Sequence, residues 1–499
     1  MHITFYTAQV ELYLTTKLIT MNAPVNFKNL LSSPPAALSP LSDVFLAALQ
    51  STVGKHLSTA QAVLEHHGRD ESPYPITPPQ AVVFAQNTTM VQAVVQLCAE
   101  HNVPVVPYGV GSSLEGNILA IAGGVCIDMS QMNAIIHIHA EDMTATVQAG
   151  VTRKQLNEAL KNTGLFFPID PGADASLGGM SATRASGTNA VRYGTMRENV
   201  VSLTVVTAAG ELVHTAKRAR KSSAGYDLTR LFVGSEGTLG VITEVTVRLY
   251  PKPEAVMAAV CNFPSIDAAV QATIQIIQMG VPIARVELLD EYAVAAVNAH
   301  DKLGLITTPM LMFEFHGTPA SVAEQVKTVQ DIAAEFKGSG FVWADKVEDR
   351  TKLWQARHNA YFALLQMKHG CRAISTDTCV PISRLADCIN DTVAELEVMK
   401  IEHNIPYGIV GHVGDGNFHV LMLVDPSQPK ELAVAEAINL KLVKRAISMD
   451  GTCTGEHGIG LHKIDFMADE FNAATLNVMR AVKHAIDPAG IMNPGKILR

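Results

Sequence analysis

The chain has 499 residues, 48% of them hydrophobic and 17% charged, with a formal net charge of −9. This length exceeds what one hydrophobic core usually supports, so we expect two or three domains. The negative charge argues against a nucleic-acid partner, because phosphate binding needs clustered Lys and Arg. No stretch approaches the roughly 20 apolar residues that a membrane-spanning helix requires.

The cysteines and the N-terminus bear on the cellular compartment. Seven cysteines are dispersed without a CxxC spacing, which is typical of reduced thiols and excludes an iron–sulfur cluster with closely spaced ligands. The first 20 residues contain one Lys, no Arg and Glu11, unlike a signal peptide or an Arg-rich transit peptide. Met21 is an alternative start. We predict a cytoplasmic protein, and leave a peripheral membrane contact open.

The first half of the chain alternates short strands, helices and turns. After a loose arm over residues 1–45, we expect a domain over 46–253 with its core at 77–253. The pattern predicts the following elements in order: strand, helix, strand and turn over 77–109, strands within 124–150, a helix over 151–164 closed by Gly164, a hairpin over 200–214, and a strand that ends at Pro251 and Pro253.

The second half has a different pattern. Helical segments at 267–280 and 321–338 alternate with strand-like segments at 282–290, 309–315 and 341–345. This order predicts an α+β domain over 254–420, with helices on one face of an antiparallel sheet. The remaining segment, 421–499, is expected to be mostly helical.

Three glycine-rich loops carry the first functional signal. They lie at 107–116, 171–189 and 234–240. Glycines allow backbone N–H groups to approach a phosphate closely, and a long run of small residues lets the backbone lie against a flat ligand. A GxGxxG fingerprint that opens a helix early in the chain is absent, which counts against NAD.

The order and spacing of these loops resemble the FAD-binding domain of the vanillyl-alcohol oxidase family, also called the p-cresol methylhydroxylase type. The resemblance implies an α+β fold with a two-subdomain FAD-binding domain, an α+β cap domain and a helical C-terminal segment that completes the flavin and metal site. The residues that it places on FAD are Pro107, Gly109, Gly111, Ser112, Ser113, Pro171, Gly179, Ser181, Ala182, Gly187, Asn189, Val241 and Ile242. Covalent members carry a His where this chain has Ser112, so we expect non-covalent FAD.

A histidine-rich pattern in the C-terminal half indicates a metal. The segment GHVGDGNFH places His412 and His419 around a Gly-Asp-Gly turn, and GEHG adds Glu456 and His457. Two His and one Glu are a common ligand set for Zn or Mn.

These two segments together resemble the branch of the family that contains D-lactate dehydrogenase, glycolate oxidase D subunit and D-2-hydroxyglutarate dehydrogenase. The resemblance implies that His412, His419 and Glu456 bind a divalent metal and that His457 is the general base. An imidazole can take the proton of a metal-bound hydroxyl while hydride leaves the α-carbon for flavin N5.

The substrate is expected to be a small 2-hydroxy acid. In the segment WQARHNAYFAL, the same branch has an Arg at the position of Arg357 that binds the substrate carboxylate in bidentate fashion. Relatives that use dicarboxylates carry a Lys and an Asn where this chain has Ser375 and Leu421, which favours a monocarboxylate such as D-lactate.

Three functions remain open from the sequence. The first is D-lactate oxidation with electrons passed to a cytochrome or quinone. The second is a glycolate oxidase D subunit or a D-2-hydroxyglutarate dehydrogenase, and the third is a non-catalytic FAD-binding subunit. The intact metal and base motifs argue against the third. A homodimer stays open.

Overall fold

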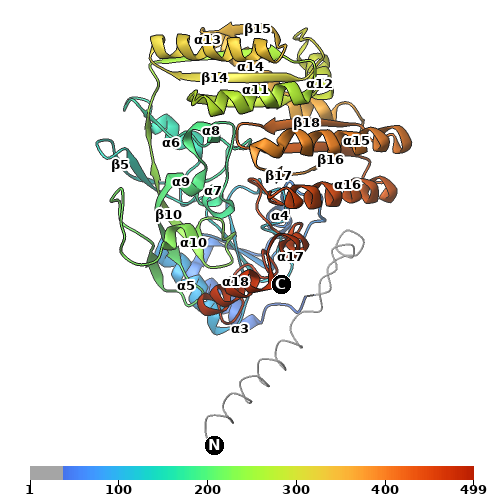
Figure 1. The fold of residues 1–499 in the computed structure, drawn as a ribbon. Helices are drawn as coiled ribbons and strands as arrows, with labels where there is room; N and C mark the ends of the chain where they lie inside the picture. Colours follow the sequence, from blue (N-terminus) through green and yellow to red (C-terminus); the bar gives the residue numbers. More distant parts are fainter. Residues whose placement is uncertain (1–37) are drawn as a thin grey trace, which may run out of the picture.

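The computed structural model describes residues 38–499. The expected N-terminal arm over 1–45 therefore lies mostly outside the described residues, and the first described helix is α3 (Asp43–Val53). Figure 1 shows two sheet-containing parts below and a third part above them; of the C-terminal helices, α16 (Pro429–Ser448) lies at the right and α18 (Ala473–Ile486) at the bottom, near α3. Among the described residues, no helix is long and apolar enough to cross a bilayer.

The first part is a four-stranded sheet with the order β1-β2-β4-β3. Its strands β2 (Ala81–Phe84), β4 (Val125–Asp128) and β3 (Val105–Tyr108) are parallel, whereas β1 (Leu57–Ser58) pairs antiparallel with β2. Helix α5 (Thr88–Glu100) connects β2 to β3 and buries one side that includes Val91, Val94 and Val95. The predicted strand–helix–strand unit is confirmed.

The second part is an antiparallel five-stranded sheet with the order β5-β6-β10-β8-β9. The strands are β5 (Ile135–His139), β6 (Thr144–Gln148), β8 (Val200–Val206), β9 (Leu212–His214) and β10 (Val241–Arg248). The predicted hairpin at 200–214 is confirmed, and Gly210 at its turn has a positive φ of 74°. The helix expected over 151–164 is shorter in the structure, where α6 spans Arg153–Ala159. Beyond its end, the Thr163 hydroxyl donates to the carbonyl of Leu160.

The third part is an eight-stranded sheet with the order β15-β12-β14-β13-β18-β19-β16, and β17 also pairs with β19. Its strands are β12 (Ala255–Asn262), β13 (Ile283–Leu289), β14 (Met310–Gly317), β15 (Ser339–Ala344), β16 (Arg372–Ser375), β17 (Thr378–Cys379), β18 (Tyr407–His412) and β19 (Asn417–Val424). The predicted boundary at residue 420 falls inside β19.

Helices cover both faces of this third sheet, so the prediction of helices on one face is wrong. One apolar core joins the sheet to α11 (Ile266–Gln278), α13 (Pro319–Glu335), α15 (Leu385–His403) and α16 (Pro429–Ser448). A second core joins the other face to α12 (Glu291–Asp301) and α14 (Val347–Leu365). Strands such as β14 are buried along nearly their whole length, which requires a cover on each side.

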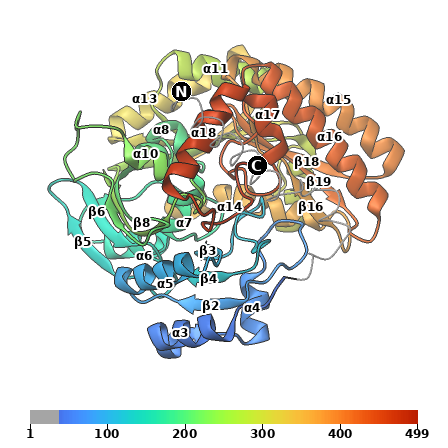
Figure 2. The ribbon, with the colours of Figure 1, turned by 90° about the horizontal axis from the view of Figure 1, so that it is seen from below.

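The C-terminal segment returns to the first sheet. After α17 (Met467–Glu470) and α18 (Ala473–Ile486), the N–H of Val105 donates to the Ile491 carbonyl, and the N–H of Asn493 donates to the Val105 carbonyl. Figure 2 shows this segment running across the side of the molecule that carries the first two sheets. The end of the chain is thereby joined to the strand that precedes the first glycine-rich loop.

Candidate functional site

The two predicted metal-binding histidines lie on one β-hairpin. His412 ends β18 and His419 lies in β19, in a register that pairs His412 with Asn417 and Val410 with His419. Side chains alternate along a strand, so both imidazoles point to the same face of the sheet. Their ring centroids are 5.4 Å apart.

Glu456 completes this group from a separate loop. Its Oε1 lies 3.2 Å from Nε2 of His412 and 3.3 Å from Nε2 of His419. The ligand atoms of all three residues lie within 4.8 Å of one another. Each imidazole uses Nδ1 outside the group, His412 toward Glu287 at 2.7 Å and His419 toward the Thr376 carbonyl at 2.9 Å. Such contacts fix the Nε2 atoms toward a common point, which is the arrangement that a divalent metal requires.

The charges of the group also fit a cation. Burial opposes a charge on His412, but the carboxylates of Glu287 and Glu456 outweigh it and hold the pKa of His412 well above its usual range. Burial likewise opposes the charge of Glu456, and the two imidazoles keep the pKa of this carboxyl well below its usual range. A divalent ion between them would neutralise the carboxylates without protonated imidazoles. The residues therefore fit a metal of the Zn or Mn type.

The Glu287 carboxylate connects Arg357 to His412 of this group. It projects from α14, and its Nε donates to Oε2 of Glu287 at 2.8 Å. Glu287 belongs to β13 and is fully buried, whereas the Arg357 side chain is 14% exposed. With Nε engaged, the terminal nitrogens remain to bind a substrate carboxylate.

His457 lies against the metal group on the other side. Its ring stacks on that of His419, with centroids 5.2 Å apart and an interplanar angle of 7°. The Nδ1 atom is 3.1 Å from Oε1 of Glu115. Burial opposes a charge on the ring, but Asp377 and Glu115 outweigh it and raise the pKa of His457. Within the described chain Nε2 has no hydrogen-bond partner, so this atom can accept a proton.

The glycine-rich loops predicted for FAD converge in the structure. A Cβ on Gly109 would lie 2.6 Å from the Ser176 hydroxyl, at the start of α7 (Leu177–Thr183), and a Cβ on Gly237 would lie 2.9 Å from Pro107. The backbone N–H groups of residues 110–113 donate no hydrogen bond within the described chain. The buried Ser235 hydroxyl also has no partner there. Unused donors beside glycines, which leave room for a close approach, fit a pyrophosphate.

Other predicted flavin residues have partners of their own. The Ser181 hydroxyl donates to the Leu177 carbonyl, and Val241 is fully buried in the core of the first part. Asn189 donates to the Pro168 carbonyl and accepts from Nε of Arg285. These side chains therefore also contribute to holding the fold together. Of the other predicted positions, Gly179 and Ala182 lie within α7, Pro171 and Gly187 lie in the segments before and after it, and Ile242 follows Val241 in β10.

Two residues chosen from the sequence as indicators of substrate size are neighbours. Ser375 and Leu421 form a cross-strand pair of β16 and β19. Leu421 follows His419 by two positions, so it points to the same face of the sheet. This face offers no cationic side chain at either position.

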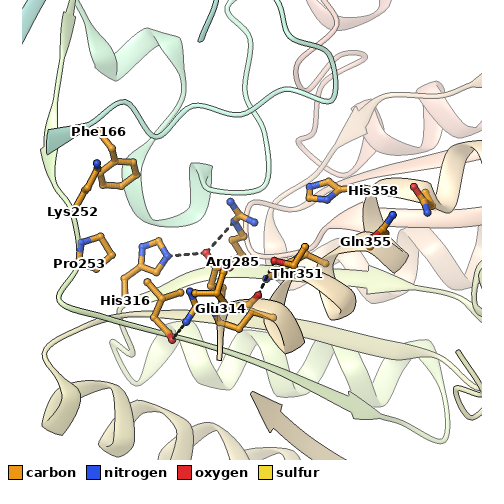
Figure 3. A pocket seen from close by; sticks show the side chains of 14 residues that line it. Phe166, Lys252, Pro253, Arg285, Glu314, His316, Thr351, Gln355 and His358 are labelled. Carbon is orange, nitrogen blue, oxygen red and sulfur yellow. Dashed lines mark hydrogen bonds and ion pairs between the residues drawn. The ribbon is translucent and has the colours of Figure 1, made fainter. Parts of the chain in front are cut away.

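A cavity of about 540 Å³ is lined by side chains of α14, β13 and β14, among them His358, Arg285 and Glu314 (Figure 3). Arg285, in the lining, is two positions from Glu287 in β13. His358, also in the lining, directly follows Arg357 in α14. Lys252 adds a further cation from the second part of the molecule. Arg285 is paired within the cavity region with Asp170 at 3.2 Å and Glu314 at 3.5 Å.

The sequence analysis did not identify four buried carboxylates around the site: Glu115, Glu236, Glu287 and Asp377. Asp377 accepts from the backbone N–H groups of Glu456 and His457, at 3.0 and 2.9 Å, and so holds the loop that carries both. An acidic residue inside an apolar strand, as in the segment 283–289, is the signal that could have revealed Glu287.

Known protein families match both halves of the chain. A family model described as FAD linked oxidases, C-terminal domain, matches residues 252–497, and one described as FAD binding domain matches residues 79–216.

The chain is also similar to curated proteins over most of its length. It is 50% identical to a probable mitochondrial D-lactate dehydrogenase of Danio rerio, covering 91% of each chain. It is 45% identical to a mitochondrial D-lactate dehydrogenase [cytochrome] of Arabidopsis thaliana, covering 91% of this chain and 80% of that protein. Identity to the glycolate oxidase subunit GlcD of Bacillus subtilis is 34%, covering 86% and 91%.

Among solved structures, p-cresol methylhydroxylase superposes with a TM-score of 0.74 at 18% identity, covering 92% of this chain and 98% of that one. At this identity the likeness concerns the fold.

Proposed function

The chain belongs to the FAD-linked oxidases, in the branch of the D-lactate dehydrogenases and glycolate oxidase D subunits, and from this premise we propose that it oxidises D-lactate to the corresponding 2-oxo acid. The expected p-cresol methylhydroxylase-type fold is confirmed, and the protein is an FAD-dependent oxidoreductase. The observation that carries the proposal is the set of contacts that links Arg357 through Glu287 to His412, and His457 to His419.

Each residue has a distinct task in this proposal. The terminal nitrogens of Arg357 bind the substrate carboxylate, while Glu287 holds its Nε. Nε2 of His457 takes the proton of the substrate hydroxyl. His412, His419 and Glu456 hold the divalent ion. Bound FAD supplies the hydride acceptor and the bound ion lowers the pKa of the hydroxyl.

The Ser375–Leu421 pair favours D-lactate over D-2-hydroxyglutarate, which is larger and carries a second carboxylate. A second substrate carboxylate at this position would meet a hydroxyl and an apolar side chain, and would lose its hydration without a cationic partner. Glycolate, which lacks the methyl group of lactate, is the second candidate, because the chain is also 34% identical to a glycolate oxidase subunit.

The acceptor and the location belong to the same proposal. In this proposal a cytochrome or quinone takes the electrons from the flavin, and the name of the Arabidopsis relative indicates a cytochrome for that protein. The sequence favours the cytoplasm, whereas these relatives are named mitochondrial. Subcellular fractionation, with salt and detergent extraction compared, separates a soluble protein from one bound to a membrane surface.

A substrate panel tests the proposal. Purified protein is assayed with an artificial electron-accepting dye and D-lactate, L-lactate, glycolate or D-2-hydroxyglutarate, before and after treatment with a chelator. We expect the highest kcat/KM for D-lactate and a loss of activity on chelation that added metal reverses. A higher kcat/KM for glycolate would identify the second candidate function.

A further inference from the structure

Carboxylates from distant parts of the chain hold the loop that carries His457. Asp377 accepts from the N–H of His457, and Glu236 in the third glycine-rich loop accepts from the N–H groups of Ile459 and Gly460, at 2.7 and 2.9 Å. Glu115 lies near the end of the first glycine-rich loop, and its backbone carbonyl accepts from the N–H of Leu461 at 2.8 Å. The loop is therefore fixed to the segments predicted to bind FAD.

Of these carboxylates, Glu115 is the one that contacts the His457 ring at hydrogen-bond distance. Its Oε1 is 3.1 Å from Nδ1 of His457 and 2.9 Å from Nζ of Lys463, and its Oε2 is 2.8 Å from Nδ1 of His462. The Glu115 side chain is 1% exposed. A buried carboxylate requires such partners, and in turn fixes their orientation.

We propose that Glu115 is a positioning residue for the reaction: its carboxylate accepts the Nδ1–H of His457 and so presents Nε2 to the substrate. The inference rests on the proposed function, in which His457 is the base. It adds that the orientation of the base depends on a side chain of the FAD-binding part, 342 positions earlier in the sequence.

If Glu115 only stabilised the fold, its substitution would leave the rate of flavin reduction by the folded enzyme unchanged. Lys463 also contacts Asp377 at 3.2 Å, so Glu115 is not its sole ionic partner. The stacking of His457 on His419 does not by itself distinguish the two orientations of the ring related by a rotation of about 180°, in which Nδ1 changes place with Cδ2 and Nε2 with Cε1. Glu115 supplies this distinction.

The test compares Glu115→Ala with Glu115→Gln, whose amide oxygen can still accept from Nδ1–H. Glu436→Gln is the matched control, because Glu436 contacts His462 at 3.4 Å and is 31% exposed. In the FAD- and metal-loaded proteins, we expect Glu115→Ala to lower the rate of anaerobic flavin reduction by D-lactate about 10–100-fold, with near-parental substrate affinity and metal content. Glu115→Gln should recover part of this rate, and Glu436→Gln should match the parent.

Parental rates in Glu115→Ala would overturn the proposal. If Glu115→Ala fails to fold, the double variant Glu115→Ala/Lys463→Met removes the facing cation and has the same expected result. Independently, ¹⁵N NMR of the parent, at a pH where the ring is neutral, should show the proton of His457 on Nδ1, and a proton on Nε2 would overturn the proposal. A His457→Ala variant that reduces flavin at the parental rate would instead refute the proposed function.

Discussion

The carboxylate of Glu287 joins His412 to Arg357: Oε1 lies 2.7 Å from Nδ1 of His412, and Oε2 lies 2.8 Å from Nε of Arg357. The side chain that orients a metal ligand thus also orients the group that binds the substrate carboxylate. Burial opposes the charge of Glu287, but His412 and Arg357 outweigh it and lower the pKa of this carboxyl. Metal affinity and substrate affinity are therefore expected to change together when Glu287 is altered.

Glu287→Gln tests this link. The amide cannot accept from both partners, because one of its two polar atoms is a donor. We expect metal affinity to fall about 10–100-fold, measured by metal titration, and the KM for D-lactate to rise at saturating metal. Glu291→Gln, at the start of α12, is the control. An unchanged KM in metal-saturated Glu287→Gln would show that Arg357 does not depend on Glu287.

His412→Ala tests the assignment of the metal ligands. Removing one of three protein ligands should lower bound metal and activity together, and millimolar added metal should restore part of the activity. Metal content is measured by elemental analysis after dialysis. His484→Ala, at an exposed position of α18, is the matched control. Full metal content in His412→Ala would exclude His412 as a ligand.

The attachment of the flavin follows from Ser112. A serine at this position offers no imidazole for a covalent link, so acid precipitation should release FAD into the supernatant. Absorbance spectra of the pellet and the supernatant measure the distribution. Yellow colour retained by the pellet would show a covalent link through another residue.

Lys496 in the C-terminal tail predicts a pH dependence of stability. Burial lowers the pKa of Lys496 to about 7, against the attraction of Glu236 and Asp70. In the unfolded chain the lysine pKa is about 10.4. At a pH between about 7 and 10.4, Lys496 is therefore protonated in the unfolded chain and neutral in the folded chain. This group therefore makes the free energy of unfolding rise with pH above about 7, by on the order of 1 kcal/mol per pH unit.

Lys496→Met removes this contribution. Unfolding midpoints of the parent and the variant are compared at pH 7, 8 and 9. The stability of the parent relative to the variant should increase over this range. A constant difference would show that Lys496 stays protonated in the fold.

The sequence predicted those parts of the site that lie close together in the chain. His412 and His419 are seven positions apart, and a Gly-containing turn between two apolar segments is sufficient to place them on one hairpin. Glu287 was not predicted, because it approaches His412 only through the pairing of β13 with β18, which no local pattern encodes. The same limit applies to Glu115, whose contact with His457 depends on the packing of two domains.

The error in the third part has a similar origin. Neither β12 (Ala255–Asn262) nor α12 (Glu291–Asp301) was predicted from the sequence, and α12 covers the second face of the sheet together with α14. Helix α12 is rich in alanine and has a weak apolar stripe, so its burial depends on α14 and the sheet beneath it.

The central claim is that D-lactate reduces the enzyme-bound flavin in a reaction that requires His457. The most direct measurement is anaerobic stopped-flow absorbance of the flavin band, which separates this step from the electron acceptor. The account predicts rapid bleaching of the parent by D-lactate, much slower bleaching by L-lactate, and a loss of about 10²–10⁴-fold in His457→Ala with FAD and metal retained. Failure of D-lactate to bleach the parent, or near-parental bleaching in His457→Ala, would contradict it.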